Sequence, residues 1–362
     1  MNALNLPVNR KHAQESKTLN MGFFNFYIMY DVIMASIRNS ILATVVYYDI
    51  LDFPLTMFEV HKYLINPERL SGDSFPEVIS LGQVVKELET LVTGGYIGSK
   101  NGFYFLSGRD DSYELRIERE KIAAQKWKKF LRIAKWFQVV PYLRAILASG
   151  SLAINNTDKE SDFDVLSVAK SGRLYTCRIF LCLVASIFRA RRTRSDIIAP
   201  DKFCFNHYIT NKNMNIRHES LYNAQTYANL KPVLAGNEIF NRFYAENIWL
   251  NKYIYNFKPA DKFILRSVAP NYVLAGIGKF GEFILSSPLG DKLEDWAKKY
   301  QQKRIRENPV TYEPGGRVVF TDNELEFHPQ SFETFAIDKY NRGLKQLGII
   351  PLIEEKDSGL TV

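Results

Sequence analysis

Two aspartates, Asp162 and Asp164, stand two positions apart where a polar stretch gives way to an apolar run. On a β-strand, residues i and i+2 point to the same side, so both carboxylates leave one face while Phe163 and Val165 point into a core. Adjacent carboxylates repel each other unless a cation lies between them. Such oxygen ligands suit Mg2+, which binds one or two carboxylates together with substrate phosphates. The spacing therefore predicts a site for Mg2+ (or Mn2+).

A Gly-Ser pair, Gly150-Ser151, follows an apolar run and precedes the aspartates. Glycine lets the backbone approach a ligand closely, and a serine at a helix start offers a hydroxyl and an N–H group to phosphate. Ser161, directly before the aspartates, is a further candidate nucleotide contact. A plainer interpretation is an Asp-rich turn in which Ser161 and Asp162 satisfy backbone groups. That interpretation does not account for Asp164, which lies inside the apolar run.

This arrangement, a Gly-Ser bend followed by Asp-x-Asp between apolar residues, resembles the signature of the nucleotidyltransferase superfamily that includes DNA polymerase β. The resemblance covers roughly residues 120–211 and includes the order of the flanking elements. It implies a polymerase-β-like core that transfers a nucleoside monophosphate from a nucleoside triphosphate to an acceptor, with Mg2+. It also implies Asp162 and Asp164 as catalytic metal ligands, with Gly150, Ser151 and Ser161 on the nucleotide.

The third strand of the core, expected over residues 202–210, departs from the superfamily pattern. Polymerase-β-like enzymes usually carry a third carboxylate there, whereas this strand offers Asn206 and His207. Asn206 can act as a neutral oxygen ligand, and His207 as a base if it faces the aspartates. Ordinary structural roles for both residues are the alternative. The missing acid motivates a second hypothesis, a catalytically lapsed nucleotidyltransferase fold that binds nucleotide as a regulatory module.

Composition limits the class of protein. The chain has 362 residues, enough for two or three domains, and its 46% hydrophobic and 24% charged residues are typical of a globular protein. A net charge of +8 is compatible with a polyanionic substrate. Three cysteines do not suggest a disulfide framework, and no Cys/His group has zinc-site spacing, so we expect a cytoplasmic protein.

We expect neither a membrane span nor a signal peptide. The longest apolar run, residues 174–188, is interrupted by Arg178 and is too short to cross a bilayer. Residues 21–34 are aromatic and apolar, and we expect a short docked helix there, but the segment carries Asp31 and has no small-residue cleavage site.

Residues 37–108 are expected to form a winged-helix-like domain, with three helices and a hairpin turning at Asn101-Gly102. Winged helices often bind DNA through their third helix. Here five Lys/Arg face eight Asp/Glu, and the third helix carries Glu87 and Glu89, so duplex DNA is disfavoured as a partner. A docking or scaffold role is the preferred interpretation.

The elements that position the aspartates complete an α/β (α+β) protein. A helix over residues 121–138 carries an apolar stripe and six basic residues, which indicates either a core-facing helix with a solvated face or a basic wall that attracts nucleotide or RNA. Residues 212–350 are expected to form a mostly helical region with a β-hairpin near 316–328, followed by a loose acidic tail. The acceptor, whether protein, RNA or a small molecule, remains open.

Overall fold

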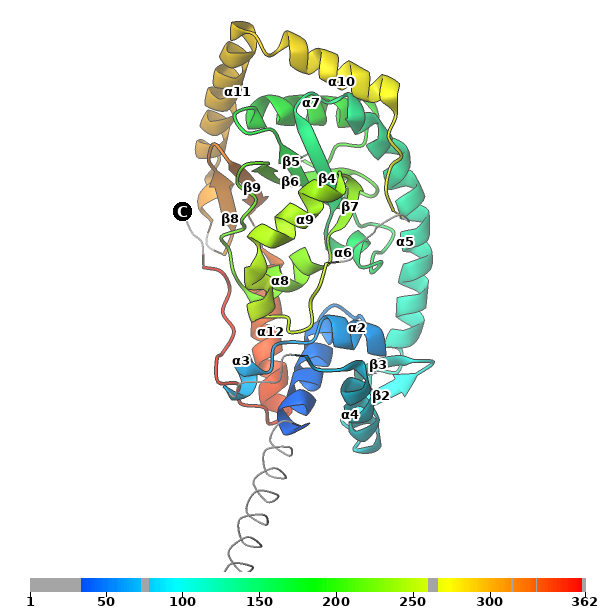
Figure 1. Cartoon of the computed structure of the whole chain (residues 1–362). Coiled ribbons are helices and arrows are strands. Elements are labelled where there is room, and N and C mark those ends of the chain that lie inside the picture. The colour runs from blue at the N-terminus through cyan, green and yellow to red at the C-terminus, as the bar shows by residue number, and fades with distance from the viewer. Residues whose placement is uncertain are drawn as a thin grey trace, which may run out of the picture.

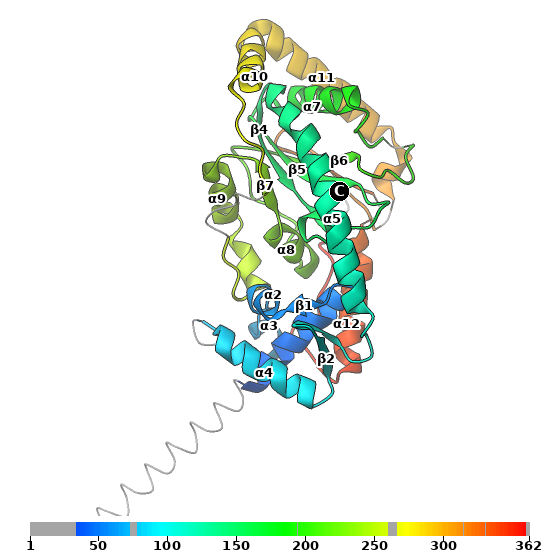
Figure 2. The same cartoon turned by 90° about the vertical axis from the view of Figure 1, so that its right-hand side faces the viewer.

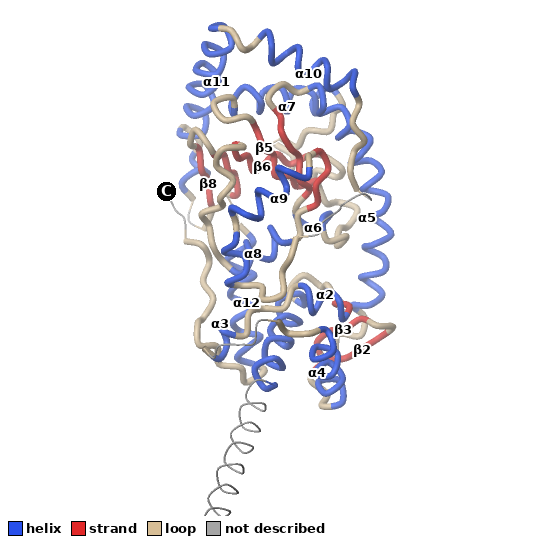
Figure 3. Tube along the Cα trace, in the orientation of Figure 1, coloured by secondary structure: helices blue, strands red, loops and turns tan. Residues whose placement is uncertain are grey.

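The protein is described by a computed structural model over residues 34–72, 78–193, 195–259, 266–313, 315–329 and 331–359. Small N-terminal elements lie at one end, a mixed sheet lies in the middle, and the long helices α10 and α11 lie at the other end (Figures 1 and 2). Helices and strands both make up large parts of the structure (Figure 3), which confirms a mixed α/β protein. The helix expected within residues 21–34 falls almost entirely outside the described residues.

The N-terminal elements follow the expected order of helices and hairpin. Residues 34–49 are helical. They are followed by β1 (Leu55–Thr56), α2 (Met57–Lys62), α3 (Glu68–Ser71), α4 (Leu81–Thr93), β2 (Ile97–Lys100) and β3 (Phe103–Leu106), with sheet order β1-β3-β2. Ser80 and Gln83 form a capping box that fixes the start of α4. Asn101 and Gly102 have φ of 51° and 83°, the left-handed values that a tight two-residue hairpin needs.

These N-terminal elements share one apolar core with later parts of the chain. Buried Tyr48 and Leu64 belong to the same cluster as Leu147 and Leu166 of the central sheet and Leu344 near the C-terminus. The hydroxyl of Tyr48 also donates to Oε1 of Gln225 at 2.8 Å. The small end of the molecule is therefore packed firmly onto the rest.

The central sheet has six strands in the order β7-β4-β5-β6-β9-β8. Its elements are α5 (Ser112–Ala134), the 3-10 helix η1 (Lys135–Val139), β4 (Leu143–Ala148), α6 (Gly150–Ala153), β5 (Phe163–Ala169), α7 (Leu174–Ile187), β6 (Phe203–Thr210), α8 (Leu221–Ala228), β7 (Lys231–Leu234), α9 (Asn237–Glu246), η2 (Ile248–Lys252), β8 (Arg317–Phe320) and β9 (Glu324–His328). Strand β5 runs parallel to β6, and the other described neighbours pair antiparallel.

Each face of the sheet packs against its own set of helices. Phe163 and Val165 belong to a cluster that includes residues of α5 and α7. Leu166 and Val168, which alternate with them, join the cluster that includes residues of α8 and α9. Both Asp164 and Leu166 therefore lie on the side of β5 that faces α8.

Lys231-Pro232 interrupts the helical spacing of residues 219–251, which predicts a break between helices at this point. Lys231 and Pro232 begin the edge strand β7, which pairs antiparallel with β4. Proline has no N–H to donate, but an edge strand needs hydrogen bonds on one side only. The residues that interrupt the helical periodicity therefore form an additional strand of the sheet.

The C-terminal region also corrects two expectations. After α10 (Tyr272–Ile284), α11 (Pro288–Arg306), η3 (Pro309–Tyr312) and α12 (Phe332–Gln346), the tail is not loose. Its Glu355 is buried and accepts from Arg69 through both oxygens, at 2.5 and 2.9 Å. The apolar sequence of residues 263–286 predicts packed helices, whereas α10 exposes Tyr272, Val273, Ile277, Phe280, Phe283 and Ile284. Among the described residues, no helix combines the length and apolarity that crossing a bilayer requires.

Candidate active site

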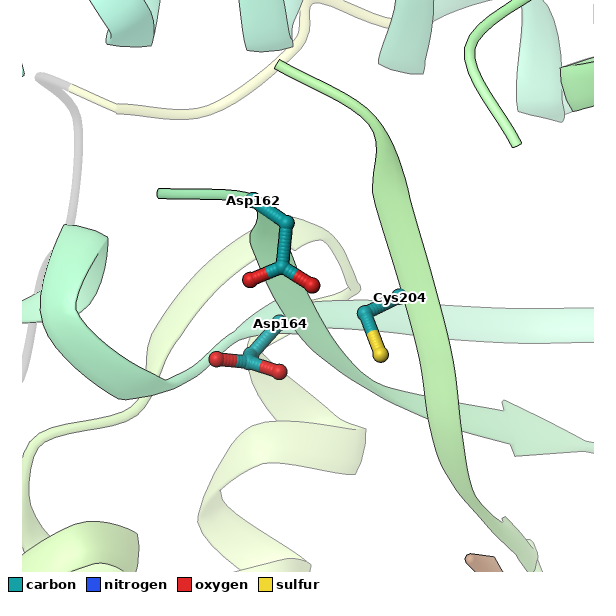
Figure 4. A group of neighbouring side chains, drawn as sticks. All are labelled: Asp162, Asp164 and Cys204. Atoms are coloured by element: carbon teal, nitrogen blue, oxygen red, sulfur yellow. The ribbon is translucent and has the colours of Figure 1, made fainter. Parts of the chain in front are cut away.

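Strand β5 brings the two aspartates of the motif together. Ligand atoms of Asp162, Asp164 and Cys204 all lie within 4.8 Å of one another (Figure 4). Cys204 comes from the parallel strand β6, where it stands opposite Asp164 in the register. The side chain of Asp162 is 15% exposed, so the pair is largely screened from solvent without being sealed.

The Gly-Ser bend lies directly against Asp164. Gly150 has φ of +62°, and a Cβ on it would lie 2.4 Å from Oδ2 of Asp164. The N–H of Ser149 donates to the backbone carbonyl of Asp164 at 2.9 Å, which ties the bend to β5. Ser151 follows in the short helix α6, whose first N–H groups have no partner within the helix. A side chain at position 150 would collide with the Asp164 carboxylate, so this position favours glycine.

Ser161 does not join this group by any contact of its side chain. Its hydroxyl donates to Oδ1 of Asp158 at 2.7 Å, and its N–H donates to the same oxygen at 2.8 Å. These bonds close a local turn of the kind that Asp and Ser favour. Ser161 therefore shapes the loop before the aspartates.

The loop between the bend and the aspartates is held by α5. Nζ of Lys126 donates to the carbonyls of Lys159 and Ser161 at 3.1 and 2.7 Å and to Oδ1 of Asp201 at 2.9 Å. Nε1 of Trp127 donates to Oδ1 of Asn155 at 3.0 Å. Lys126 is only 4% exposed. This stretch of α5 thus faces the interior, as the plainer interpretation expected, and one of its lysines positions the aspartate loop.

The structure separates the two residues expected at the third position. Strand β6 has one extra residue between the pairs Asp164↔Cys204 and Leu166↔His207, a β-bulge. Nδ2 of Asn206 donates to Oδ1 of Asp164 at 3.0 Å. His207 instead lies 3.2 Å from Glu324 and 3.1 Å from the hydroxyl of Tyr227. His207 is therefore not placed to act as a base at the aspartates, which corrects that expectation.

One arginine compensates the paired carboxylates. Nη1 of Arg192, in the loop after α7, donates to Oδ2 of Asp162. Burial and the charge of Asp162 together raise the pKa of Asp164 to about 7, against the opposing effects of Arg192 and the Asn206 hydrogen bond. Burial and the same carboxylates raise the pKa of the Cys204 thiol. Two acids with a single guanidinium leave room for a further positive charge.

Arg192 and Cys204 were missed as site residues. The sequence did show an unusual group of arginines over residues 189–194, but a solvated loop explained them equally well. Cys204 carried no signal, because its place opposite Asp164 depends on the pairing of β6 with β5.

No protein-family model, curated protein or solved structure matches this chain.

Proposed function

We propose that the protein is a nucleotidyltransferase that moves a nucleoside monophosphate from a nucleoside triphosphate to an acceptor, with release of pyrophosphate. The observation that supports this most is the contact between the Gly150 bend and Asp164, with Asp162 beside it. It places backbone N–H groups next to paired carboxylates, the two kinds of group that a metal-bound triphosphate needs.

The donor atoms at this site fit Mg2+ (or Mn2+). Asp162 and Asp164 supply the carboxylate oxygens that these hard cations prefer. The Cys204 sulfur suits softer metals, and its raised pKa keeps it a thiol, so it is not part of the proposed magnesium set. When bound, the cation would neutralise phosphate charge and hold the reacting phosphate in place.

The chain's own groups would bind and orient the nucleotide. The free N–H groups and the Ser151 hydroxyl at the start of α6 would donate to phosphate oxygens. Asn206 holds the Asp164 carboxylate in a fixed rotation through its amide N–H. Arg192, whose side chain is 37% exposed, is a cation that can serve the phosphates once Asp162 has another partner.

A second candidate function is nucleotide binding without transfer. Strand β6 presents a thiol and an amide at Cys204 and Asn206, where the superfamily pattern has a carboxylate. Neither group is a good base for an acceptor hydroxyl. A regulatory module that senses nucleotide would keep the binding groups and lose the transfer.

Calorimetric titration of the four nucleoside triphosphates, with and without Mg2+, tests the binding step. We expect Mg2+-dependent binding by the natural protein and its loss in the double variant Asp162→Asn/Asp164→Asn. The exposed Asp110→Asn is the matched control and should bind normally. Equal binding by all three proteins would remove the site from consideration.

Incubation with α-labelled nucleoside triphosphates and a panel of RNA, protein and small hydroxyl acceptors then separates the two functions. Transfer of label with release of pyrophosphate supports the enzyme. Mg2+-dependent binding with no transfer to any acceptor supports the regulatory module.

A further inference from the structure

A second group of ionisable side chains is buried further along the same sheet. Glu324 and Glu326 alternate on β9, and His207 of β6 stands opposite Glu326 in the antiparallel register. His218 reaches the same place from the loop before α8. All four residues are buried, with exposures of 3% for His207, 4% for His218, 8% for Glu324 and 0% for Glu326.

Ligand atoms of His207, Glu324 and Glu326 all lie within 4.8 Å of one another, and His218 approaches both carboxylates. Nε2 of His207 lies 3.2 Å from Oε1 of Glu324, and Nε2 of His218 lies 3.8 Å from that oxygen and 3.1 Å from Oε2 of Glu326. Nitrogen and oxygen ligands about 2.1 Å from a tetrahedral zinc ion lie about 3.4 Å apart. The observed separations bracket this value.

Two of these groups lack the hydrogen bonds that burial demands. Within the described part of the chain, neither ring nitrogen of His218 nor Oε2 of Glu326 makes a hydrogen bond. Nε2 of His218 and Oε2 of Glu326, which are 3.1 Å apart, therefore lie at ion-pair distance but do not have the geometry of a hydrogen bond. Buried polar atoms are rarely left in this state, which indicates that something else satisfies them.

Neighbouring residues contact the outer atoms of His207 and Glu326, so that Nε2 and Oε2 of these side chains face inward. The hydroxyl of Tyr227 contacts Nδ1 of His207 at 3.1 Å, which leaves Nε2 as the inward atom. Arg317 and His328 both contact Oε1 of Glu326, at 2.8 and 2.9 Å, and leave Oε2 facing His218. Partners of this kind orient the ligands of protein metal sites.

The charges of the buried groups at this place also favour a bound cation. Three buried carboxylates, Glu324, Glu326 and Glu333, surround one guanidinium, Arg317, which is 2.8 Å from both Glu326 and Glu333. With neutral imidazoles, one divalent cation would balance these four groups. Buried carboxylates without such compensation are strongly disfavoured.

We propose that His207, His218, Glu324 and Glu326 form a binding site for a divalent transition metal of the zinc class, separate from the Asp162–Asp164 site. Two imidazoles and two carboxylates are the nitrogen and oxygen ligands that zinc accepts, whereas Mg2+ prefers oxygen alone. The ion would join β6, β9 and the loop before α8, so its role would be to hold the C-terminal hairpin onto the sheet.

Zinc binding by the full-length protein tests this proposal. After treatment with chelator and dialysis, the protein is titrated with Zn2+ in competition with a chromophoric chelator, and with Co2+ followed by visible absorption. We expect one equivalent of Zn2+ to bind with a dissociation constant of about 1 µM or tighter. We expect a cobalt spectrum of nitrogen and oxygen ligation without a thiolate band.

His218→Gln and Glu326→Gln should each weaken Zn2+ binding by at least about 10-fold. His61→Gln is the matched control, because that ring bonds to the carbonyl of Ile79 in the N-terminal region. Asp162→Asn/Asp164→Asn should bind Zn2+ normally, which separates this site from the first. Circular dichroism checks that each variant is folded.

Three outcomes would overturn the proposal. One is a folded natural protein that binds no Zn2+ in the competition titration. Another is unchanged binding in both His218→Gln and Glu326→Gln. The last is a thiolate–cobalt band that disappears in Cys204→Ser, which would place the ion at the aspartates.

Discussion

At the scale of single residues, the candidate active site depends on one close contact. Gly150 lies where a side chain would collide with Asp164, and it adopts a left-handed φ that glycine tolerates best. Arg192 and Asn206 each engage one aspartate, at Asp162 and Asp164 respectively. The two aspartates are thus contacted by a glycine backbone, a guanidinium and a side-chain amide.

Replacing Gly150 by alanine should damage the site more than strain alone explains. The added Cβ would lie 2.4 Å from Oδ2 of Asp164, at a φ of +62°. We expect a loss of about 1–3 kcal/mol in the free energy of unfolding and loss of Mg2+-dependent nucleotide binding. Gly172→Ala is the control, because Gly172 has φ of +76° with open space around it. Equal effects of both changes in urea unfolding and calorimetry would contradict the contact.

The pKa of Asp164 predicts how stability depends on pH. Its folded pKa of about 7 lies above the ordinary value of 3.8, so the folded state holds a proton that the unfolded chain releases between these limits. The stability gained from this proton is complete below about pH 4 and is lost as pH rises through about 7. Asp164→Asn, which cannot ionise, should therefore raise the melting temperature of the metal-free protein at pH 8.

That gain should shrink progressively as pH falls from 8 to 5, because the natural carboxyl becomes protonated over this range. Thermal melts in chelator at pH 5, 6, 7 and 8 measure it. The exposed Asp110→Asn should leave the curve unchanged. A gain for Asp164→Asn that is the same at pH 5 and pH 8 would rule out the raised pKa.

At the scale of elements, α5 positions the aspartate loop and the bulge in β6 sorts its side chains. Lys126 ties α5 to the carbonyls of Lys159 and Ser161, just before Asp162. The extra residue in β6 lets Asn206 reach Asp164 while His207 turns to Glu324. The bulge therefore directs Asn206 to the aspartates and His207 to the buried group around Glu324.

Removal of the Lys126 ammonium should loosen this loop. Lys126→Met removes the buried donor to the carbonyls of Lys159 and Ser161 and to Asp201, and we expect the free energy of unfolding to fall by about 1.5–3 kcal/mol. Nucleotide affinity should fall with it, because the loop carries Asp162. Lys129→Met is the control, since Lys129 pairs with the same Asp201 but is exposed, and exposed pairs contribute little. A Lys126→Met protein as stable as Lys129→Met in urea would contradict this role.

Helix α4 presents less negative charge to its surroundings than its sequence suggests. Glu87, offered as an argument against DNA binding by α4, is buried and pairs with Arg38 at 3.0 Å. It therefore does not present a negative charge to a partner, whereas Glu89 is exposed. The acidic balance of the N-terminal region as a whole still argues against a phosphate backbone.

At the scale of the whole molecule, the first and last elements that the structure describes are joined. The N-terminal helix, the sheet and α12 contribute to one apolar cluster, and the tail is fixed by Arg69 and Glu355. Burial raises the pKa of Glu355, so this carboxyl depends on its arginine partner. The molecule is thus expected to lose its structure in one step.

Scanning calorimetry should show a single unfolding transition that includes the N-terminal elements. Glu355→Ala should lower its temperature without splitting it, because Arg69 would be left buried without its carboxylate. Glu354→Ala is the control, since that residue pairs with Lys345 at the surface. Two resolved transitions in the natural protein would show that the regions unfold independently.

Much of the fold follows from patterns that are local in the sequence. The periodicity of residues 81–93, the Asn101-Gly102 turn and the hairpin over residues 317–328 are each fixed by neighbours a few positions away. Asp162 and Asp164 share a face for the same reason, because β-strands alternate every residue. Strand β7 was missed because an edge strand of four residues carries too short a pattern to compete with helical neighbours.

The sequence pattern is enough to predict two aspartates beside a glycine bend on an α/β sheet. What surrounds them depends on the tertiary structure, since Cys204 and Asn206 reach the pair through the register of β5 with β6, and Arg192 reaches it from the loop between α7 and β6. It also gathered His207 and Glu324, 117 positions apart, into a buried group that no sequence spacing announces. The alternation of side chains along a strand decides on which face of the sheet a residue lies. The pairing of distant strands decides which other residues it contacts.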